Sequence, residues 1–229
     1  MDSISQRQNG EGHRQRLREK FLNSGLEGFH DYEIVELLLT LGTPRKDCKI
    51  PAKEALKKFG SLRGILEAPA DELTTLPGIG VKNVFGLKLA QAIALRYLND
   101  RVMGEDFLRS SEEVMNYLRL NLRDRKREVF LVIFLNGRNQ ITAMEELFVG
   151  TLTTSAVYPR EVIDRTLKNK AAALVLVHNH PSGSPQPSKE DLDITRRLKE
   201  ATAAIDVTIH DHIIIAGDIF YSFADHGVL

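Results

Sequence analysis

The chain has 229 residues and carries 31 Lys and Arg against 31 Asp and Glu, so its formal net charge is zero. Its hydrophobic fraction of 42% is ordinary for a globular protein, and no run of about 18 apolar residues predicts a membrane-spanning helix or a membrane partner. The single cysteine, Cys48, excludes an internal disulfide, and the polar first 21 residues lack the apolar core of a secretion signal, so we expect a cytoplasmic protein.

The first part of the chain predicts an all-helical domain. The length exceeds the usual ~100–200 residues of one domain, and the Gly- and Asp-bearing segment 99–106 marks a boundary. We therefore expect domains at 1–104 and 105–229. Asp31 is a plausible cap for the first of the short helices. Clusters of apolar residues predict helices over 32–41, 50–59 and 61–67, with a longer helix passing through Tyr97.

A glycine-rich turn joins two of these helices. Its sequence, LPGIGVK, spans residues 76–82 and resembles a helix-hairpin-helix element, a small fold that is often bound to DNA. Gly78 and Gly80 would let backbone N–H groups approach a phosphate at the positive end of the second helix, with Lys82 nearby. Residues 1–104 carry only 16 Lys and Arg against 13 Asp and Glu, which is a weak basic excess for a DNA-binding domain. DNA is therefore a possible partner rather than the preferred one.

The second part of the chain alternates helices and strands. Mixed elements in this order predict a three-layer α/β domain with a central sheet, which makes the whole chain an α+β two-domain protein. The predicted elements are a helix over 110–122, a strand over 127–135, a strand ending near 150, a helix from Pro159, a strand over 171–177, a helix from Ser188, and strands over 207–216 and 219–223.

The most informative pattern follows the predicted strand over 171–177. Side chains at i and i+2 of a strand share a face, so His178 and His180 would project together from the strand's end. A seven-residue loop then leads to Ser188 and to Asp191 in the first turn of the next helix. Ser188 and Asp191 also match a helix-capping pattern, and both functions are compatible. Two imidazoles and one carboxylate with a fourth position open are typical of a catalytic zinc site.

This constellation resembles the JAMM motif of the MPN metalloprotease family, which has an upstream glutamate, then H-x-H, seven residues and S-x-x-D. The resemblance implies a cytidine-deaminase-like fold, zinc bound by His178, His180 and Asp191, and hydrolysis of a peptide or isopeptide bond. It also implies that Ser188 helps to hold the water or the developing oxyanion. Asn179 stands where deubiquitinating members most often have Ser or Thr, which leaves the substrate class open.

Three segments, GTLTTSAVYPREV, HNHPSGSPQPSKED and DHIII, resemble the RadC-type bacterial branch of that family, whose name is associated with DNA repair. In the family the catalytic base is a glutamate at the start of a strand that follows a helix, and Glu128 occupies that position. Glu145 and Glu146 are weaker alternatives. A second H-x-H, formed by His210 and His212, has no S-x-x-D after it. One of its histidines could orient a metal ligand, but hydrogen-bonded structural residues are the favoured interpretation.

Three functions remain open from the sequence. The preferred one is a zinc-dependent amidase acting on a peptide or protein, with a helical targeting domain. The second is a DNA-associated protein in which binding by the helix-hairpin-helix matters most. The third is a metal-stabilised scaffold without catalysis, against which Glu128 argues, because a structural metal site has no need of a base.

Overall fold

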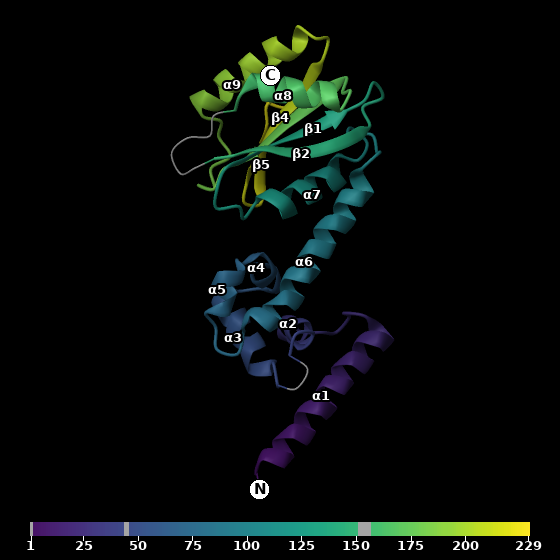
Figure 1. Ribbon diagram of the computed structural model, residues 1–229, viewed down its shortest axis with the longest axis vertical. Coiled ribbons are helices and arrows are strands. Elements are labelled where there is room, and N and C mark those ends of the chain that lie inside the picture. Colours follow the sequence, from purple (N-terminus) through teal and green to yellow (C-terminus); the bar gives the residue numbers. More distant parts are fainter. Residues whose placement is uncertain (1, 44–45, 151–156) are drawn as a thin grey trace. The chain divides into compact units, whose positions relative to one another are not determined.

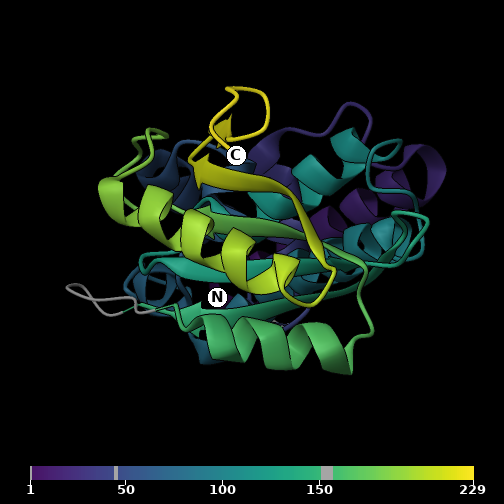
Figure 2. The same cartoon turned by 90° about the horizontal axis from the view of Figure 1, so that it is seen from above.

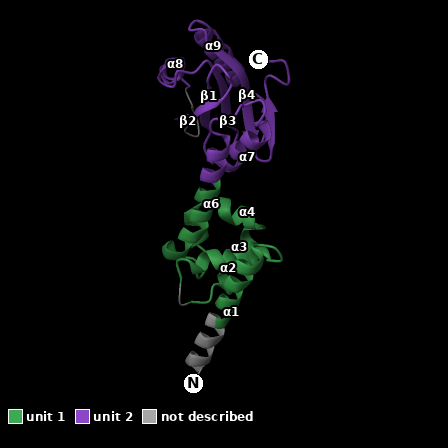
Figure 3. Ribbon diagram, turned by 90° about the vertical axis from the view of Figure 1, so that its right-hand side faces the viewer, with its two compact units in different colours: residues 1–94 green, residues 95–229 purple. Residues whose placement is uncertain are grey.

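The computed structural model describes residues 2–43, 46–150 and 157–229, so part of the segment GTLTTSAVYPREV lies outside the described residues. The chain divides into two compact units, residues 1–94 and 95–229, which we describe separately (Figure 3). The division falls inside a long helix rather than in the predicted boundary segment 99–106. That helix continues to Val102, and Gly104, with a φ of 83°, follows its end.

The first unit is helical, as the sequence predicted (Figure 1). The N-terminal helix had no separate prediction. No helix among the described residues is long and apolar enough to cross a membrane, and the cytoplasmic location stays a prediction. The helices are α1 (Asp2–Ser24), α2 (Asp31–Thr40), α3 (Lys49–Phe59), α4 (Leu62–Glu67), α5 (Ala70–Thr74) and α6 (Val81–Val102), of which α6 continues into the second unit.

Helices α2 and α6 touch backbone to backbone at two glycines. A Cβ atom built on Gly86, in the second turn of α6, would lie 2.0 Å from the carbonyl oxygen of Leu38 in α2. A Cβ atom on Gly42 would lie 1.8 Å from the carbonyl oxygen of Lys82. Glycine in a helix interior costs about 1 kcal/mol relative to alanine, so the close approach of the two helices explains why α6 contains one.

The predicted cap of the first short helix was wrong. Asp31 is the first residue of α2, and its carboxylate instead accepts a hydrogen bond of 3.0 Å from the backbone N–H of Leu62, at the start of α4. At the start of α2, the Glu33 carboxylate accepts from the N–H of His30 at 3.0 Å. Asp31 therefore links two helices that are distant in sequence, which local pattern alone does not reveal.

The second unit contains a mixed sheet with helices, and its elements follow the predicted order. Its sheet has the strand order β2-β1-β3-β4-β5, in which every neighbouring pair is antiparallel except β3 and β4. Helix α9 makes the connection that a parallel pair requires. The elements are α7 (Ser111–Leu122), β1 (Val129–Leu135), β2 (Ile141–Val149), α8 (Pro159–Lys168), β3 (Ala173–Asn179), α9 (Lys189–Ala203), β4 (Thr208–Ala216) and β5 (Ile219–Ser222).

The central strands β1 and β3 are buried along their whole length, because the sheet has a hydrophobic core on each face. On β1, Leu131 and Ile133 belong to the core that includes residues of α7. The intervening Val132 and Phe134 belong to the core that includes residues of α8 and α9, which lie over the sheet in Figure 2. Alternate side chains thus fix both faces of the sheet, and the candidate site lies at the end of these two strands.

Candidate metal centre

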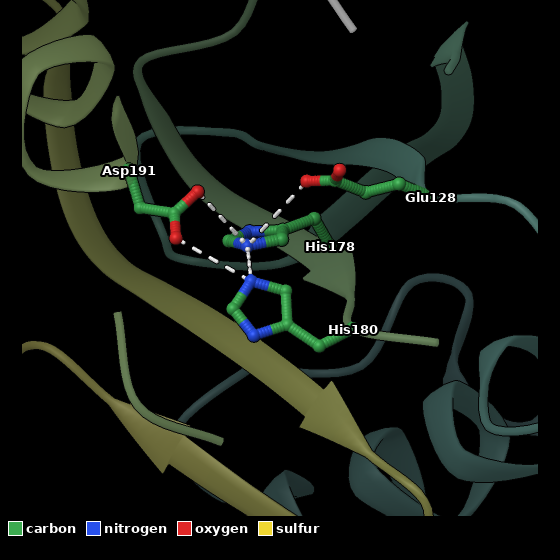
Figure 4. A group of neighbouring side chains, drawn as sticks. All are labelled: Glu128, His178, His180 and Asp191. Atoms are coloured by element: carbon green, nitrogen blue, oxygen red, sulfur yellow. Dashed lines mark hydrogen bonds and ion pairs between the residues drawn. The ribbon is translucent and has the colours of Figure 1, made fainter. Parts of the chain in front are cut away.

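Four side chains of metal-ligand type meet where the end of β3 adjoins the start of β1 (Figure 4). His178 is in β3, and His180 directly follows that strand. Glu128 directly precedes β1, which is antiparallel to β3, so the start of one strand lies beside the end of the other. Asp191 lies in the first turn of α9. One ligand atom of each side chain lies within 4.8 Å of all the others.

The distances inside this group are those of direct contact. The Nε2 atoms of His178 and His180 are 2.9 Å apart. The carboxylate of Asp191 lies 3.2 Å from Nε2 of His178 through Oδ1, and 3.4 Å from Nε2 of His180 through Oδ2. The nearest oxygen of Glu128 is 3.9 Å from Nε2 of His178. The three ligands predicted from the sequence and the predicted base are therefore brought together by the fold.

Ser188 and Asp191 form the predicted capping box at the start of α9. The Ser188 hydroxyl accepts a bond of 3.1 Å from the N–H of Asp191. In return, Oδ2 of Asp191 accepts from both the N–H and the hydroxyl of Ser188, each at 2.7 Å. The cap therefore fixes the direction of the carboxylate as well as the start of the helix.

Hydrogen bonds within the group shift the pKa values of Asp191 and His180 in opposite directions. Burial would raise the pKa of the Asp191 carboxyl, but hydrogen bonds from His178 and His180 outweigh burial and hold it well below its usual range. Its hydrogen bond with Asp191 raises the pKa of His180 above the ordinary value despite partial burial. Nδ1 of His180 lies 2.7 Å from the carbonyl oxygen of Ser184, which can only accept, so Nδ1 bears a proton.

Behind His178 lies a fully buried histidine of the second H-x-H. Nε2 of His212 is 2.8 Å from Nδ1 of His178, and Nδ1 of His212 is 2.6 Å from the hydroxyl of Thr195 in α9. Burial, followed by the charge of His178, holds the pKa of His212 well below its ordinary value. His212 therefore contacts the ring nitrogen of His178 that does not face the Asp191 carboxylate.

Asn179, the residue between the two histidines, holds the segment that carries Glu128. It is 1% exposed. Its side-chain oxygen accepts a bond of 2.8 Å from the N–H of Val129, and its amide nitrogen donates to the carbonyl oxygens of Arg125 and Arg127, at 3.3 and 3.2 Å. Because successive strand residues point to opposite faces, Asn179 contacts this segment while its neighbours face the metal centre.

The alternatives named from the sequence lie elsewhere. Glu145 contacts Asn169 at 2.8 Å, and Glu146 pairs with Arg125 at 2.7 Å. Neither is in the group of four side chains that forms the candidate metal centre. His210 bonds to Asn139 at 2.9 Å and takes no part in the centre. A register shift in the pairing of β3 with β4 leaves His210 as an extra residue, which separates its environment from that of His212.

In the first unit, the predicted DNA-contact residues Gly78 and Gly80 occupy the turn between α5 and α6, and Lys82 lies in the first turn of α6. Gly78 has a φ of 82°, which favours glycine. The buried side chain of Asn83 closes the turn, since it accepts from the N–H of Gly80 at 2.7 Å and donates to the carbonyl of Gly78 at 2.8 Å. Lys82 is exposed. The N–H of Gly80, predicted to approach a phosphate, thus already has a partner.

Two residues of the site were missed in the sequence. Asn179 was considered only as a departure from the family pattern, although a polar residue in a buried strand must find hydrogen-bond partners. Thr195 lies four residues after Asp191, and i and i+4 share a helix face, so that spacing indicates its proximity. The sequence does not reveal that Asn179 bonds to the segment before and at the start of β1, or that Thr195 bonds to His212, because these partners lie far away in the chain.

A mixed sheet with histidine and carboxylate side chains grouped beside its strand ends and at the start of α9 defines a protein with a candidate metal centre. A family model described as the RadC-like JAB domain matches residues 108–228, and a model described as UPF0758 N-terminal matches residues 12–85. The chain belongs to the UPF0758 family of proteins with a RadC-like JAB domain. The RadC-type resemblance seen in the sequence is therefore confirmed.

Relatives of known name match nearly the whole chain. A UPF0758 protein of Ruegeria pomeroyi is 40% identical over 95% of this chain and 97% of its own length. A UPF0758 protein of Thiobacillus denitrificans is 42% identical over 93% of this chain and 96% of its own. A UPF0758 protein of Fusobacterium nucleatum is 38% identical over 96% of this chain and 97% of its own length. These names state a family and no activity.

Replacing Asn179 with alanine should destabilise the protein by about 1–3 kcal/mol, because the N–H of Val129 and two carbonyl oxygens lose a buried partner. Chemical denaturation of the two proteins measures the difference. Asn169→Ala is the matched control, since it removes an amide that is only partly buried, and a change within about 0.5 kcal/mol is expected for it. An equal decrease in the free energy of unfolding in both variants would contradict the proposed stabilising role of the Asn179 hydrogen bonds.

Proposed function

We propose that the second unit is a zinc-dependent hydrolase that cleaves a peptide or isopeptide amide bond. The observation that supports this most directly is the group of His178, His180, Asp191 and Glu128, whose ligand atoms lie within 4.8 Å of one another. Membership of the JAB class favours the same function. The proposal includes the three-layer, cytidine-deaminase-like arrangement of the MPN fold, which the cores on both faces of the sheet support.

The donor set suits zinc. Two imidazole nitrogens and one carboxylate oxygen are typical ligands of catalytic zinc, and they leave a fourth position for a reactant. The Nδ1 atoms of His178 and His180 are both engaged in hydrogen bonds on the far side of each ring, so the Nε2 atoms are the available donors. The lowered pKa of Asp191 keeps its carboxylate charged, as a metal ligand must be.

Glu128 is the proposed general base. Zinc bound at this centre would supply an activated water molecule and polarise the scissile carbonyl. The carboxylate of Glu128 would take the proton from the attacking water and deliver it to the leaving amine. Its side chain is 37% exposed, so both solvent and a substrate can reach it. A structural metal centre would need no such base, and Glu128 therefore favours hydrolysis over a scaffold function.

The family resemblance implies that Ser188 holds the water or the developing oxyanion, but its hydrogen bonds favour a structural role. Its hydroxyl donates to Oδ2 of Asp191 and accepts from the N–H of the same residue. We therefore propose that Ser188 primarily fixes the direction of Asp191. It can donate to a developing oxyanion only when its hydroxyl proton turns away from that carboxylate, because a hydroxyl has a single proton to donate.

As a second function, we propose that the first unit contacts DNA phosphates through the start of α6. The supporting observation is the exposed Lys82 in the first turn of this helix, whose positive dipole end follows the glycine turn. Since Asn83 already bonds to the N–H of Gly80, the contact would depend on Lys82 more than on the glycine amides. Such binding would be independent of base sequence.

The zinc proposal predicts about one zinc ion per chain in the purified protein after equilibration with the metal. His178→Ala and Asp191→Ala should each lose the metal, because each removes one of three protein ligands. His210→Ala is the matched control, since it removes a histidine of the other H-x-H and should keep zinc. Metal analysis decides the matter: a wild-type protein that neither contains nor binds zinc excludes the hydrolase.

Glu128→Gln should retain zinc and lose activity. Removal of a general base typically lowers the rate by about 10²–10⁴-fold. The assay is cleavage of peptide and isopeptide-linked substrates by the zinc-loaded enzyme, with Glu145→Gln as the control that changes a carboxylate bonded to Asn169. Unchanged cleavage by Glu128→Gln would show that another group acts as the base.

The DNA proposal predicts binding to duplexes of arbitrary sequence that weakens steeply with salt. Lys82→Ala should reduce the slope of log affinity against log salt by about one, whereas Lys57→Ala, which removes an exposed lysine of α3, should not. Titration of labelled duplex at several salt concentrations provides the measurement. Absence of binding at low salt would exclude this function.

A further inference from the structure

Three buried side chains form a line behind the candidate metal centre. They are His178, His212 and Thr195, which are 1%, 0% and 4% exposed. Nδ1 of His178 lies 2.8 Å from Nε2 of His212, and Nδ1 of His212 lies 2.6 Å from the hydroxyl oxygen of Thr195. That hydroxyl lies 2.5 Å from the carbonyl oxygen of Asp191. The line therefore begins at one proposed metal ligand and ends at the backbone of another.

For a neutral His212, only one arrangement of protons satisfies every member of this line. The carbonyl oxygen of Asp191 can only accept, so the single hydroxyl proton of Thr195 is donated to it. The Thr195 oxygen must then accept from a proton on Nδ1 of His212. A neutral imidazole with a proton on Nδ1 has a lone pair on Nε2, which accepts from Nδ1 of His178.

This arrangement of protons determines which ring nitrogen of His178 is free to bind a metal. With its proton on Nδ1, a neutral His178 has a lone pair on Nε2, the atom that lies 3.2 Å from Asp191 and 2.9 Å from His180. The opposite proton order would put a hydrogen on the atom that must bind the metal. Metal-bound histidines generally have their other ring nitrogen bonded to an acceptor that fixes the tautomer, and here that acceptor is itself a histidine of fixed tautomer.

Aromatic rings enclose the middle of the line. Phe223 stacks on His212 with ring centroids 4.7 Å apart, and the ring of Phe130 meets it edge-on at 5.7 Å. Both phenylalanines are buried. Their packing shields His212 from water that could replace a lost partner, so each hydrogen bond of the line depends on the next one.

We propose that Thr195 and His212 are positioning residues that set the tautomer of His178 and so hold its Nε2 ready to bind zinc. This inference rests on the proposed function of the metal centre. It assigns a definite duty to one histidine of the second H-x-H, and it explains why His212 faces the centre while His210 does not. The residues act through His178 and do not themselves touch a substrate.

Thr195→Val provides the first test, because it keeps the shape of the side chain and removes the acceptor for Nδ1 of His212. We expect zinc binding to weaken by about 10–100-fold, measured by competition with a chromophoric chelator. Thr166→Val is the matched control: Thr166 is equally buried and its hydroxyl likewise donates to the carbonyl four residues earlier, that of Val162, at 2.7 Å. Equal zinc affinity in the two variants overturns the proposal.

A pair of substitutions at His212 separates the hydrogen bond from simple packing. The side-chain oxygen of His212→Gln can still accept from His178, whereas His212→Phe has a ring but no acceptor. We expect the glutamine variant to bind zinc more tightly than the phenylalanine variant. Should phenylalanine serve as well as glutamine, His212 acts by filling space and the proposal is wrong.

Nitrogen NMR of histidine-labelled, metal-free protein reports the tautomers directly. We expect Nδ1 of both His178 and His212 to be protonated, and Nε2 of His212 to lack a proton, in the wild type and in Thr166→Val, and this order to be lost in Thr195→Val. A proton on Nε2 of His212 in the wild type overturns the proposal. Because this experiment needs no zinc, it tests the line of hydrogen bonds even if the wild-type protein proves unable to bind the metal.

Discussion

The antiparallel pairing of β1 with β3 is the constraint on which the candidate metal centre depends. It sets Phe130 opposite His178, so the residue that precedes β1 lies beside the histidines that end β3. A slip of one residue would turn every side chain of a strand to the other face of the sheet. Both strands are buried on both faces, so such a slip would exchange side chains between the two cores and disrupt the packing of each. The hydrophobic cores therefore determine where Glu128 lies.

A group of buried polar side chains is costly unless each has a partner, and the centre meets that requirement through bonds to the backbone. Asn179 bonds to three backbone groups at and just before the start of β1, Ser188 caps α9, and His180 bonds to the carbonyl of Ser184. The histidine and carboxylate atoms that face one another are satisfied mainly by contacts among themselves, and hydrogen bonds from the two histidines lower the pKa of Asp191. The fold thus stabilises the framework and concentrates its strongest electrostatic interactions at the atoms available to a metal.

The first unit is stabilised by close packing of helices at glycines and by one buried asparagine. Glycines at 42 and 86 let α2 and α6 approach backbone to backbone, and Asn83 closes the turn before α6 from within. These contacts explain the glycines and the buried asparagine as parts of the helical packing. A surface function of this unit would therefore depend on its exposed side chains, such as Lys82, more than on the turn itself. The family models match segments of both units, which indicates that the family is defined by the two together.

The sequence by itself determined the helical first part, the order of elements in the second, and the grouping of His178, His180 and Asp191 as candidate metal ligands, because each of these follows from short-range periodicity and spacing. The choice of Glu128 required resemblance to a family, since three glutamates precede candidate strands and only strand pairing decides which one meets the histidines. Tertiary structure also decided that His212 lies behind the centre, through the pairing of β3 with β4. Local sequence encodes local geometry, whereas contacts between distant strands arise from the packing of the whole core.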